Sequence, residues 1–325
     1  MHPWLEINGV EEIDRISRRI REVVGNTLRK KGVVVAVSGG IDSSVCAALS
    51  MRALGAARVF ALILPEADSS PESRSRGEML CRQLCVRFDM TDITPILSAF
   101  GCYRWRDEAI RSVFPEFGPE WKSKIVLSGS PLAGDRMNFF KVVVRNPAGD
   151  LQEKRLPLEA YLQVVAATNF KQRTRKTLEY FHADRLNYAV VGTPNRLEYD
   201  QGFFVKNGDG AADLKPIAHL YKTQVYALAD ALALPEEIRT AKPTTDTYSL
   251  EQGQDEFFFA LPYDKMDIVL FGLNHGMPSE CVAEESGLTA DQVTLVYQDI
   301  RNKRRTTYPF HMKPILMEPV PEIGS

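Results

Sequence analysis

The sequence has 325 residues, a net charge of −2 at pH 7 and 44% hydrophobic residues. Such a length allows one large α/β domain or two smaller ones with a substantial core. The small net charge excludes a bulk electrostatic attraction to nucleic acid or to an anionic membrane. We find no signal-peptide pattern and no apolar run near the roughly 20 residues that cross a bilayer. We therefore expect a cytoplasmic protein without membrane contact, and its five cysteines, which form no C-x-x-C pair, should be reduced thiols.

The first hundred residues alternate between helical and strand patterns. Apolar residues at helical spacing predict a helix over residues 11–30, and another helix is expected over 71–85. Short, mostly β-branched runs predict buried strands at 33–37, 59–64 and 86–88. This alternation predicts an α/β fold: a doubly wound parallel sheet flanked by helices, which binds ligands at the carboxyl ends of its strands.

Residues 100–165 are harder to interpret, because tryptophan, proline and glycine interrupt the patterns. Weak alternation over 139–145, before the turn residues 146–150, suggests a β-hairpin. We interpret the whole segment as an insertion that folds as a lid or a dimer-facing flap. Regular patterns return afterwards and predict a helix over 168–183, a strand at 188–191 and a helix over 220–232.

These patterns divide the chain into four parts. Residues 1–99 are expected to form the first part of the core, and residues 100–165 the insertion. Residues 166–265 would complete the core, and residues 266–325 would form a C-terminal helical hairpin and tail.

The clearest motif is SGGIDS at positions 38–43, between the first strand and a helical pattern. The backbone N–H groups of a Gly-Gly turn at a helix N-terminus converge on one point, and such a point suits a phosphate. Asp42 adds a carboxylate that is placed to hold a divalent cation against the phosphates. Because no lysine follows the glycines, this is not a Walker loop. An ordinary glycine-rich turn is the alternative interpretation.

The hexapeptide resembles the PP-loop of the ATP pyrophosphatases, which form AMP and pyrophosphate. Further motifs extend a resemblance to the ammonia-dependent NAD synthetases over most of the chain. They are NFKQRTR at 169–175, GTPNRLE at 192–198, GFFVKNGDGAAD at 202–213, LKPI at 214–217, KTQV at 222–225, KPT at 242–244 and QDE at 254–256, with Tyr263. The resemblance implies a Rossmann-like fold of the adenine nucleotide alpha hydrolase type. It also implies an ATP-dependent ligase that makes NAD from deamido-NAD and ammonia.

The resemblance further implies roles for individual residues. Asp42 and Lys222 would be catalytic, and Asp42 and Glu198 would hold Mg²⁺, the expected cofactor. ATP would contact Ala36, Val37, Ser38, Gly39, Gly40, Ile41, Asp42, Ser43, Thr193, Lys222 and Thr244. Deamido-NAD would contact Arg173, Lys206, Asp213, Asn302 and Lys303. A homodimer is expected on the same ground.

The chemistry of amide formation independently favours ATP. A carboxylate must be activated because hydroxide is a poor leaving group, and conversion into an acyl-adenylate provides a leaving group that ammonia can displace. Catalysis of this kind rests on positioning and charge neutralisation, so it requires no Ser-His-Asp or Cys-His set. The five histidines are accordingly scattered without metal-ligand spacing. No glutaminase motif is evident, so ammonia would arrive free or from a separate amidotransferase.

Four departures from the family pattern lie on the acceptor side, and one of them is the insertion at 100–165, which precedes the deamido-NAD motifs. Gln172 stands where the family usually has Ala, Lys176 where it has Met, and Asn302 where it has His. A related PP-loop amide ligase that adenylates a different carboxylic acid is therefore an alternative function.

Some of the proposed ligand contacts also have simpler interpretations. Arg173 with Arg175 could form a solvated basic face, Lys206 and Asp213 could bracket a surface hairpin, and Glu198 could be an exposed acid.

Residues 282–293 imitate a helix-turn-helix, with Gly287 in the turn and Thr289 and Gln292 placed for a capping box. A DNA-binding module is thus an alternative from another class, although the second helix carries little positive charge. We favour a helical hairpin that presents Lys303, Arg304 and Arg305 to the active site.

Overall fold

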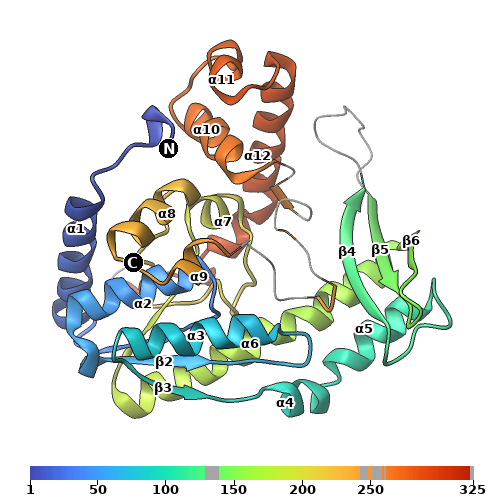
Figure 1. Ribbon diagram of the computed structural model, residues 1–325, viewed down its shortest axis with the longest axis horizontal. Helices are drawn as coiled ribbons and strands as arrows, with labels where there is room; N and C mark the ends of the chain where they lie inside the picture. The colour runs from blue at the N-terminus through green and yellow to red at the C-terminus, as the bar shows by residue number, and fades with distance from the viewer. Residues whose placement is uncertain (129–138, 242–247, 251–252, 254–257, 260, 323–325) are drawn as a thin grey trace.

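A parallel sheet of four strands, in the order β3-β2-β1-β7, forms the centre of the computed structural model (Figure 1). The structure describes residues 1–128, 139–241, 248–250, 253, 258–259 and 261–322. The strands β1, β2 and β7 consist of apolar residues and are almost entirely buried, as expected for parallel strands that helices cover on both faces. The bounds of the four strands are Val33–Ala36 (β1), Val59–Ile63 (β2), Arg87–Met90 (β3) and Ala189–Val191 (β7).

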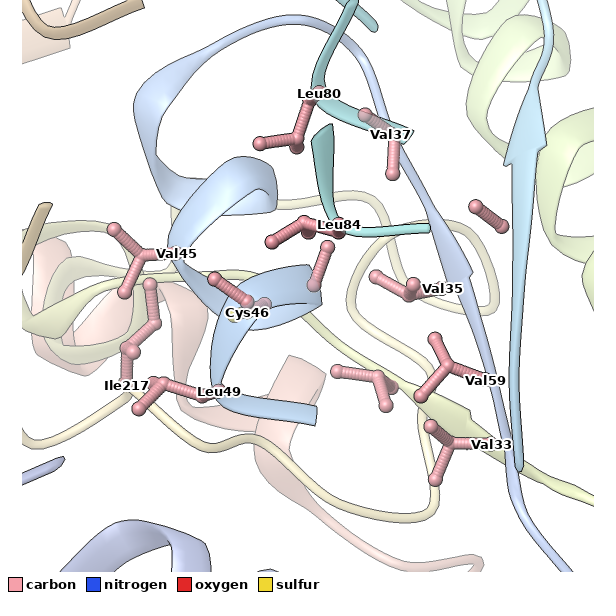
Figure 2. Packing of buried hydrophobic residues seen from close by; sticks show 14 of the residues in the cluster. Val33, Val35, Val37, Val45, Cys46, Leu49, Val59, Leu80, Leu84 and Ile217 are labelled. Atoms are coloured by element: carbon pink, nitrogen blue, oxygen red, sulfur yellow. The ribbon is translucent and has the colours of Figure 1, made fainter. Parts of the chain in front are cut away.

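Alternate residues of β1 point into two different cores. Val33 and Val35 belong to a cluster with residues of α1 (Gly9–Glu22), α2 (Ile41–Leu54), α3 (Pro71–Gln83) and α8 (Lys222–Ala231). Figure 2 shows these valines with Val45, Cys46 and Leu49 of α2 in the same cluster. Val34 lies in a second cluster, with residues of α4 (Thr94–Ala99) and α6 (Leu158–Leu186). Helices therefore cover both faces of the sheet, and the predicted doubly wound α/β fold is confirmed.

The helix α6 begins at Leu158, so the predicted start at Thr168 is wrong. Its first turns bury Ala160, Val164 and Ala167, but the nearby Leu158 and Leu162 are apolar and exposed. Apolar residues on two sides of the helix hide the single buried stripe that marks an amphipathic helix. The helix ends at Asn187, which adopts the left-handed conformation that often terminates helices.

Over its described residues, the segment 100–165 contains one helix, an antiparallel sheet and the start of α6. The helix α5 (Cys102–Arg111) precedes the strands β4 (Lys122–Ser128), β5 (Phe139–Arg145) and β6 (Leu151–Arg155), which pair in the order β4-β5-β6. The strands β5 and β6 confirm the predicted hairpin, and in its turn Gly149 N donates to Asn146 O at 2.9 Å. The strand β4 was not predicted. Its role as part of a lid or flap stays a prediction.

The C-terminal helices form a third cluster that packs against α8 and lies above it in Figure 1. They are α10 (Tyr263–Asn274), α11 (Ser279–Ser286) and α12 (Ala290–His311). Thr289 and Gln292 form the capping box that the sequence predicts at the start of α12. The other helices are η1 (Pro3–Leu5), η2 (Val23–Thr27), η3 (Ala56–Arg58), α7 (Arg196–Gln201) and α9 (Glu236–Arg239). Within the described residues, no helix is both long and apolar enough to cross a lipid bilayer.

A buried ionic cluster fastens the loop after β2 to α5 and α6. Lys171 Nζ donates to Glu66 Oε1 at 2.9 Å and to Asp68 Oδ2 at 2.6 Å, and Arg106 Nη1 donates to Asp68 Oδ2 at 2.7 Å. Although burial favours the neutral acid, the two cations lower the pKa of Asp68 below its usual range. Tyr103 completes the cluster by donating its hydroxyl hydrogen to Glu66 Oε2 at 2.7 Å. These ion pairs and hydrogen bonds therefore fix the loop after β2 against α5 and α6.

We expect Lys171→Met to lower the free energy of unfolding by about 3–5 kcal/mol, because it leaves two buried carboxylates without their main cation. Arg19→Met is the matched control, since Arg19 and Glu22 form an ion pair on the exposed face of α1 and its loss should cost under about 1 kcal/mol. Urea denaturation of both variants measures the two values. An equal decrease in the free energy of unfolding of the two variants would contradict the larger contribution expected from the buried cluster.

Candidate active site

A cavity of about 830 Å³ opens at the carboxyl ends of β1 and β2, where ligands are expected in this kind of sheet. Most of the site residues named from the sequence line its wall. They are Ala36, Val37, Ser38, Gly40, Ile41, Asp42, Ser43, Arg173, Thr193, Glu198, Lys206, Lys222 and Lys303. The structure therefore brings the expected ATP side and part of the expected acceptor side into one space.

The glycine turn forms a small polar cradle at the start of α2. Ser43 Oγ accepts from Ser38 N at 3.2 Å and donates to Gly40 O at 3.0 Å, which holds the turn closed. Gly39 has a φ of +78°, and a Cβ atom there would lie 2.2 Å from Ser73 O. Only glycine fits this position. The turn at the N-terminus of α2 has the polarity that an anion requires.

Asp42 and Lys222 form an ion pair beside this turn. Lys222 Nζ donates to Asp42 Oδ2, and Asn195 Nδ2 donates to Asp42 Oδ1 at 3.0 Å. The Lys222 side chain is only 2% exposed. Burial works against its charge, but the carboxylates of Asp42 and Glu198 raise the pKa of Lys222 above its usual value. Lys222 is therefore a fixed positive charge at the point where the phosphates would lie.

The helix α7 positions the second carboxylate of this group. Asn195 caps α7 by accepting from Leu197 N at 2.9 Å, and Glu198 Oε2 accepts from Asn195 N at 3.2 Å. The two residues form a capping box, so Glu198 is oriented by the start of its own helix. The interpretation of Glu198 as a plain exposed acid does not fit this geometry.

The acceptor side of the cavity contains a cluster of buried charges on α6. Lys176 Nζ donates to Glu179 Oε2 at 2.8 Å, and both side chains are almost completely buried. Burial raises the pKa of Glu179 and of the nearby Asp209, while Lys176 lowers both. Arg173, closer to solvent, donates from Nε to Lys206 O at 3.3 Å. The solvent-facing edge of this wall therefore carries the positive charges of Arg173 and Lys206. Its buried part carries the Lys176–Glu179 ion pair.

Three of the expected contact residues do not line the cavity, and one lies outside the described residues. Asp213 Oδ2 accepts from Val190 N at 2.7 Å and so fastens the loop 202–213 to β7. Asn302 is exposed on α12 and accepts from Arg305 Nη2 at 3.3 Å. Gly39 shapes the turn without reaching the cavity wall. Thr244 lies outside the described residues. Ligand contacts of Asp213 and Asn302 stay predictions.

Comparison with known proteins identifies the family. The NAD synthase family model matches residues 12–113 and 140–307. The chain belongs to the NAD synthase family. It is 55% identical over 316 residues to the NH3-dependent NAD(+) synthetase of Rhizobium rhizogenes, covering 97% of this chain and 95% of that protein. It is also 37% identical over 275 residues to the protein of the same name from Thermotoga maritima, covering 85% of this chain and 90% of the relative.

Solved structures agree on the fold of this NAD synthase family member. The NMN synthetase of Francisella tularensis superimposes with a TM-score of 0.63 at 21% identity, covering 96% of this chain and 99% of that chain. The NH3-dependent NAD synthetase of Campylobacter jejuni, solved with a nitrate ion, gives a TM-score of 0.63 at 22% identity. It covers 96% of this chain and all of that chain.

The C-terminal hairpin contributes side chains to the cavity wall of this NAD synthase family member. Lys303 and Thr307 of α12 line the cavity, so the helix that a DNA-binding module would present to DNA faces the site instead. Our expectation for the neighbouring arginines was wrong. Arg304 is turned aside by hydrogen bonds to Asp200 and Asn274, and Arg305 is exposed.

Sequence analysis missed Asp267, which positions Lys222 from a different helix. Asp267 Oδ1 accepts from Lys222 N at 3.2 Å and Oδ2 accepts from Thr223 N at 2.7 Å, so this residue of α10 caps α8. Burial raises the pKa of Asp267 to about 6. No sequence signal pointed to it, because the cap lies 45 residues from Lys222 in the chain.

We expect Asp267→Ala to lower kcat about tenfold or more and the free energy of unfolding by about 1–2 kcal/mol, because the start of α8 loses its cap and Lys222 its orientation. Asp264→Ala is the matched control, since Asp264 is an exposed residue in the first turn of the same helix. Steady-state kinetics and thermal unfolding measure both effects. A full kcat in the Asp267 variant, measured well below its melting temperature, would contradict the positioning role.

Proposed function

We propose that this protein catalyses the ATP-dependent amidation of deamido-NAD with ammonia, which gives NAD, AMP and pyrophosphate. The observation that carries the proposal is the Asp42–Lys222 pair at the mouth of the glycine turn, in the same cavity as Arg173 and Lys206. Curated relatives that share more than half of their residues with this chain are named NH(3)-dependent NAD(+) synthetases.

The geometry supports an adenylation mechanism in two steps. The acceptor carboxylate attacks the α-phosphorus of ATP, the bond to the β-phosphate oxygen breaks, and pyrophosphate leaves. Ammonia then attacks the acyl carbon, AMP leaves with the electrons of the acyl–oxygen bond, and the nitrogen loses a proton. Lys222 and the N–H groups of the turn at residues 38–43 would stabilise the charge that develops on the phosphates. Lys222 is buried and paired with Asp42, so its positive charge is held at the phosphate end of the cavity.

Magnesium fits the carboxylates of the site. Asp42 and Glu198 both line the cavity, and both act on the charge of Lys222. Within the described residues, no cluster of three or more histidine, cysteine, aspartate or glutamate side chains could hold a metal ion. Two carboxylates still suit Mg²⁺, because this ion commonly binds one or two carboxylates together with substrate phosphates and water. We propose that Asp42 and Glu198 hold it with ATP, where it would neutralise phosphate charge.

The nitrogen donor in this proposal is ammonia, in agreement with the names of the curated relatives. Delivery by a separate amidotransferase and location in the cytoplasm stay predictions from the sequence.

We also propose that the protein acts as a homodimer that pairs through α6 and α5. Leu158, Leu162, Ala166 and Phe170 recur every fourth residue on one side of α6, and Leu158 and Leu162 are 71% and 54% exposed. Trp105 of α5 stacks on Phe170 and extends this apolar strip. A strip of this kind on a helix of 29 residues is suited to pairing with a second copy.

We expect Leu162→Glu to convert the dimer into a monomer at micromolar concentration, because it places a charge in the centre of the apolar strip. Phe181→Glu is the control, since Phe181 is exposed on the same helix outside the strip. Sedimentation velocity of the wild-type protein and both variants gives the masses. A wild-type monomer, or a dimer that survives Leu162→Glu, would contradict this interface.

We expect Asp42→Asn to lower kcat at least 100-fold in enzyme that thermal unfolding shows to be folded, because the substitution removes a negative charge from the proposed metal and phosphate site. The control is Asp14→Asn, which alters an exposed acid on α1. Formation of AMP and NAD from ATP, deamido-NAD and ammonium is measured with and without Mg²⁺. Turnover by the Asp42→Asn enzyme at the wild-type rate would refute the role of Asp42. Failure of the wild-type enzyme to form NAD would refute the proposed function.

A further inference from the structure

The antiparallel sheet β4-β5-β6 contributes Phe140 to the wall of the cavity, and part of the sheet lies outside the family pattern. The family model leaves residues 114–139 unmatched, and these contain β4 and the first residue of β5. Phe140 of β5 and Tyr161 of α6 both line the cavity, together with Val165 and Tyr248. This aromatic end of the cavity has no role in the adenylation chemistry described above.

Phe140 and Tyr161 form a parallel stack. Their ring centroids are 3.7 Å apart, and their planes differ by 8°. Both rings are only partly buried, which leaves ring surface for a third partner in the cavity. Burial raises the pKa of the Tyr161 phenol, so the ring is neutral near pH 7. The pair is therefore an uncharged flat surface that suits another flat, uncharged ring.

A packed core holds this surface in place. The sheet contributes Ile125, Val142 and Val144 to a buried cluster that also contains Phe114 and Val164. The stacked rings Phe140 and Tyr161 lie against the same cluster. A surface fixed in this way loses little freedom when a ligand stacks on it.

The stack lies far from the reacting end of the cavity. The residues of α6 that line the cavity follow one side of the helix, and they are Tyr161, Val165, Thr168, Asn169, Gln172, Arg173, Arg175, Lys176 and Glu179. At 1.5 Å per residue, the helix rises about 18 Å between Tyr161 and Arg173. In Figure 1 the sheet β4-β5-β6 lies on the opposite side of the molecule from α1, α2 and α8. The ligand group at the stack is thus remote from Asp42.

We propose that Phe140 and Tyr161 bind the adenine base of the acceptor dinucleotide, and so determine specificity for a dinucleotide over a shorter acid. This inference rests on the proposed function. The acceptor carboxylate must meet the α-phosphorus beside Asp42, and its own adenine is separated from that carboxylate by a pyridine ring, two riboses and a pyrophosphate. The adenine of ATP is separated from the same phosphorus by one ribose. Only the acceptor carries a flat ring that can reach the remote end.

The test compares variants that remove a ring with variants that keep it. Phe140→Leu and Tyr161→Leu keep apolar volume but lose the aromatic face, and the KM for deamido-NAD should rise about 5- to 100-fold. The KM for ATP should stay within twofold of the wild-type value. Tyr161→Phe keeps the ring and should restore the wild-type KM for deamido-NAD. Phe181→Leu, on an exposed part of α6, is the control for an aromatic residue outside the cavity.

A second measurement identifies which ring of the acceptor is bound. ADP-ribose carries the remote adenosine but no pyridine, and its inhibition constant against deamido-NAD is measured at saturating ATP. We expect this constant to rise in the Leu variants by a factor similar to that of the KM. An unchanged inhibition constant beside a raised KM would assign the stack to the pyridine ring, and no inhibition of the wild-type enzyme would show that the remote end is not held. Either result would overturn the proposal, as would an unchanged KM in both Leu variants.

These outcomes separate the two proposals. If the wild-type enzyme forms NAD and both Leu variants keep its KM for deamido-NAD, the proposed function stands and only the stacking role of Phe140 and Tyr161 is refuted. A raised KM for ATP, or a fall in kcat alone, would show that the rings act on another step. Thermal unfolding of each variant confirms that the comparison is made between folded enzymes.

Discussion

The ion pair between Asp42 and Lys222 is the contact on which the site depends. Asp42 lies in the first turn of α2, directly after the glycine turn, and Lys222 begins α8, 180 residues later in the chain. A buried lysine without a counter-charge would lose its proton or destabilise the fold, so the pair requires that both helices start at the same edge of the sheet. Asn195 then binds the free oxygen of Asp42, and Asp267 fixes the start of α8. Four separate segments are therefore positioned by one charge pair and its hydrogen bonds.

The long helix α6 links this charged centre to the rest of the molecule. One of its sides lines the cavity from Tyr161 to Glu179, and another carries the exposed strip of Leu158 and Leu162. A third side packs Ala183 and its neighbours against the sheet. Because a helix with three occupied sides has no continuous polar face, its apolar residues show little net asymmetry. This explains why its beginning was hard to locate from a pattern of one buried stripe.

How much could be predicted depended on how local the physical constraint is. The glycine turn, the parallel strands and the cap at Thr289 follow from short patterns, and each is present where it was expected. The strand β4 has mixed polarity, and ten residues separate it from its partner β5 in the sequence. No local pattern therefore marks it as a strand. Asp267 and the ionic cluster around Lys171 are contacts between distant segments, and a single sequence contains no direct sign of them. The ligand contact of Asp213 stays a prediction from motif resemblance, and its hydrogen bond to Val190 N adds a role in the fold that the motif does not show.

The pair Lys176–Glu179 shows how a departure from the family pattern can be accommodated. A lysine in place of an apolar residue on the buried side of α6 would bring an uncompensated charge next to Lys215, whose pKa is already lowered by burial and by Lys176. Glu179, one turn further along the helix, accepts the hydrogen bond of Lys176 at 2.8 Å and cancels that charge. The pair thus adds no net charge to this part of the cavity wall, and Arg173 and Lys206 remain among the basic residues that line the cavity. The substitution at 176 therefore alters the packing below the acceptor without altering the charges that attract it, which is consistent with a dinucleotide as the acceptor.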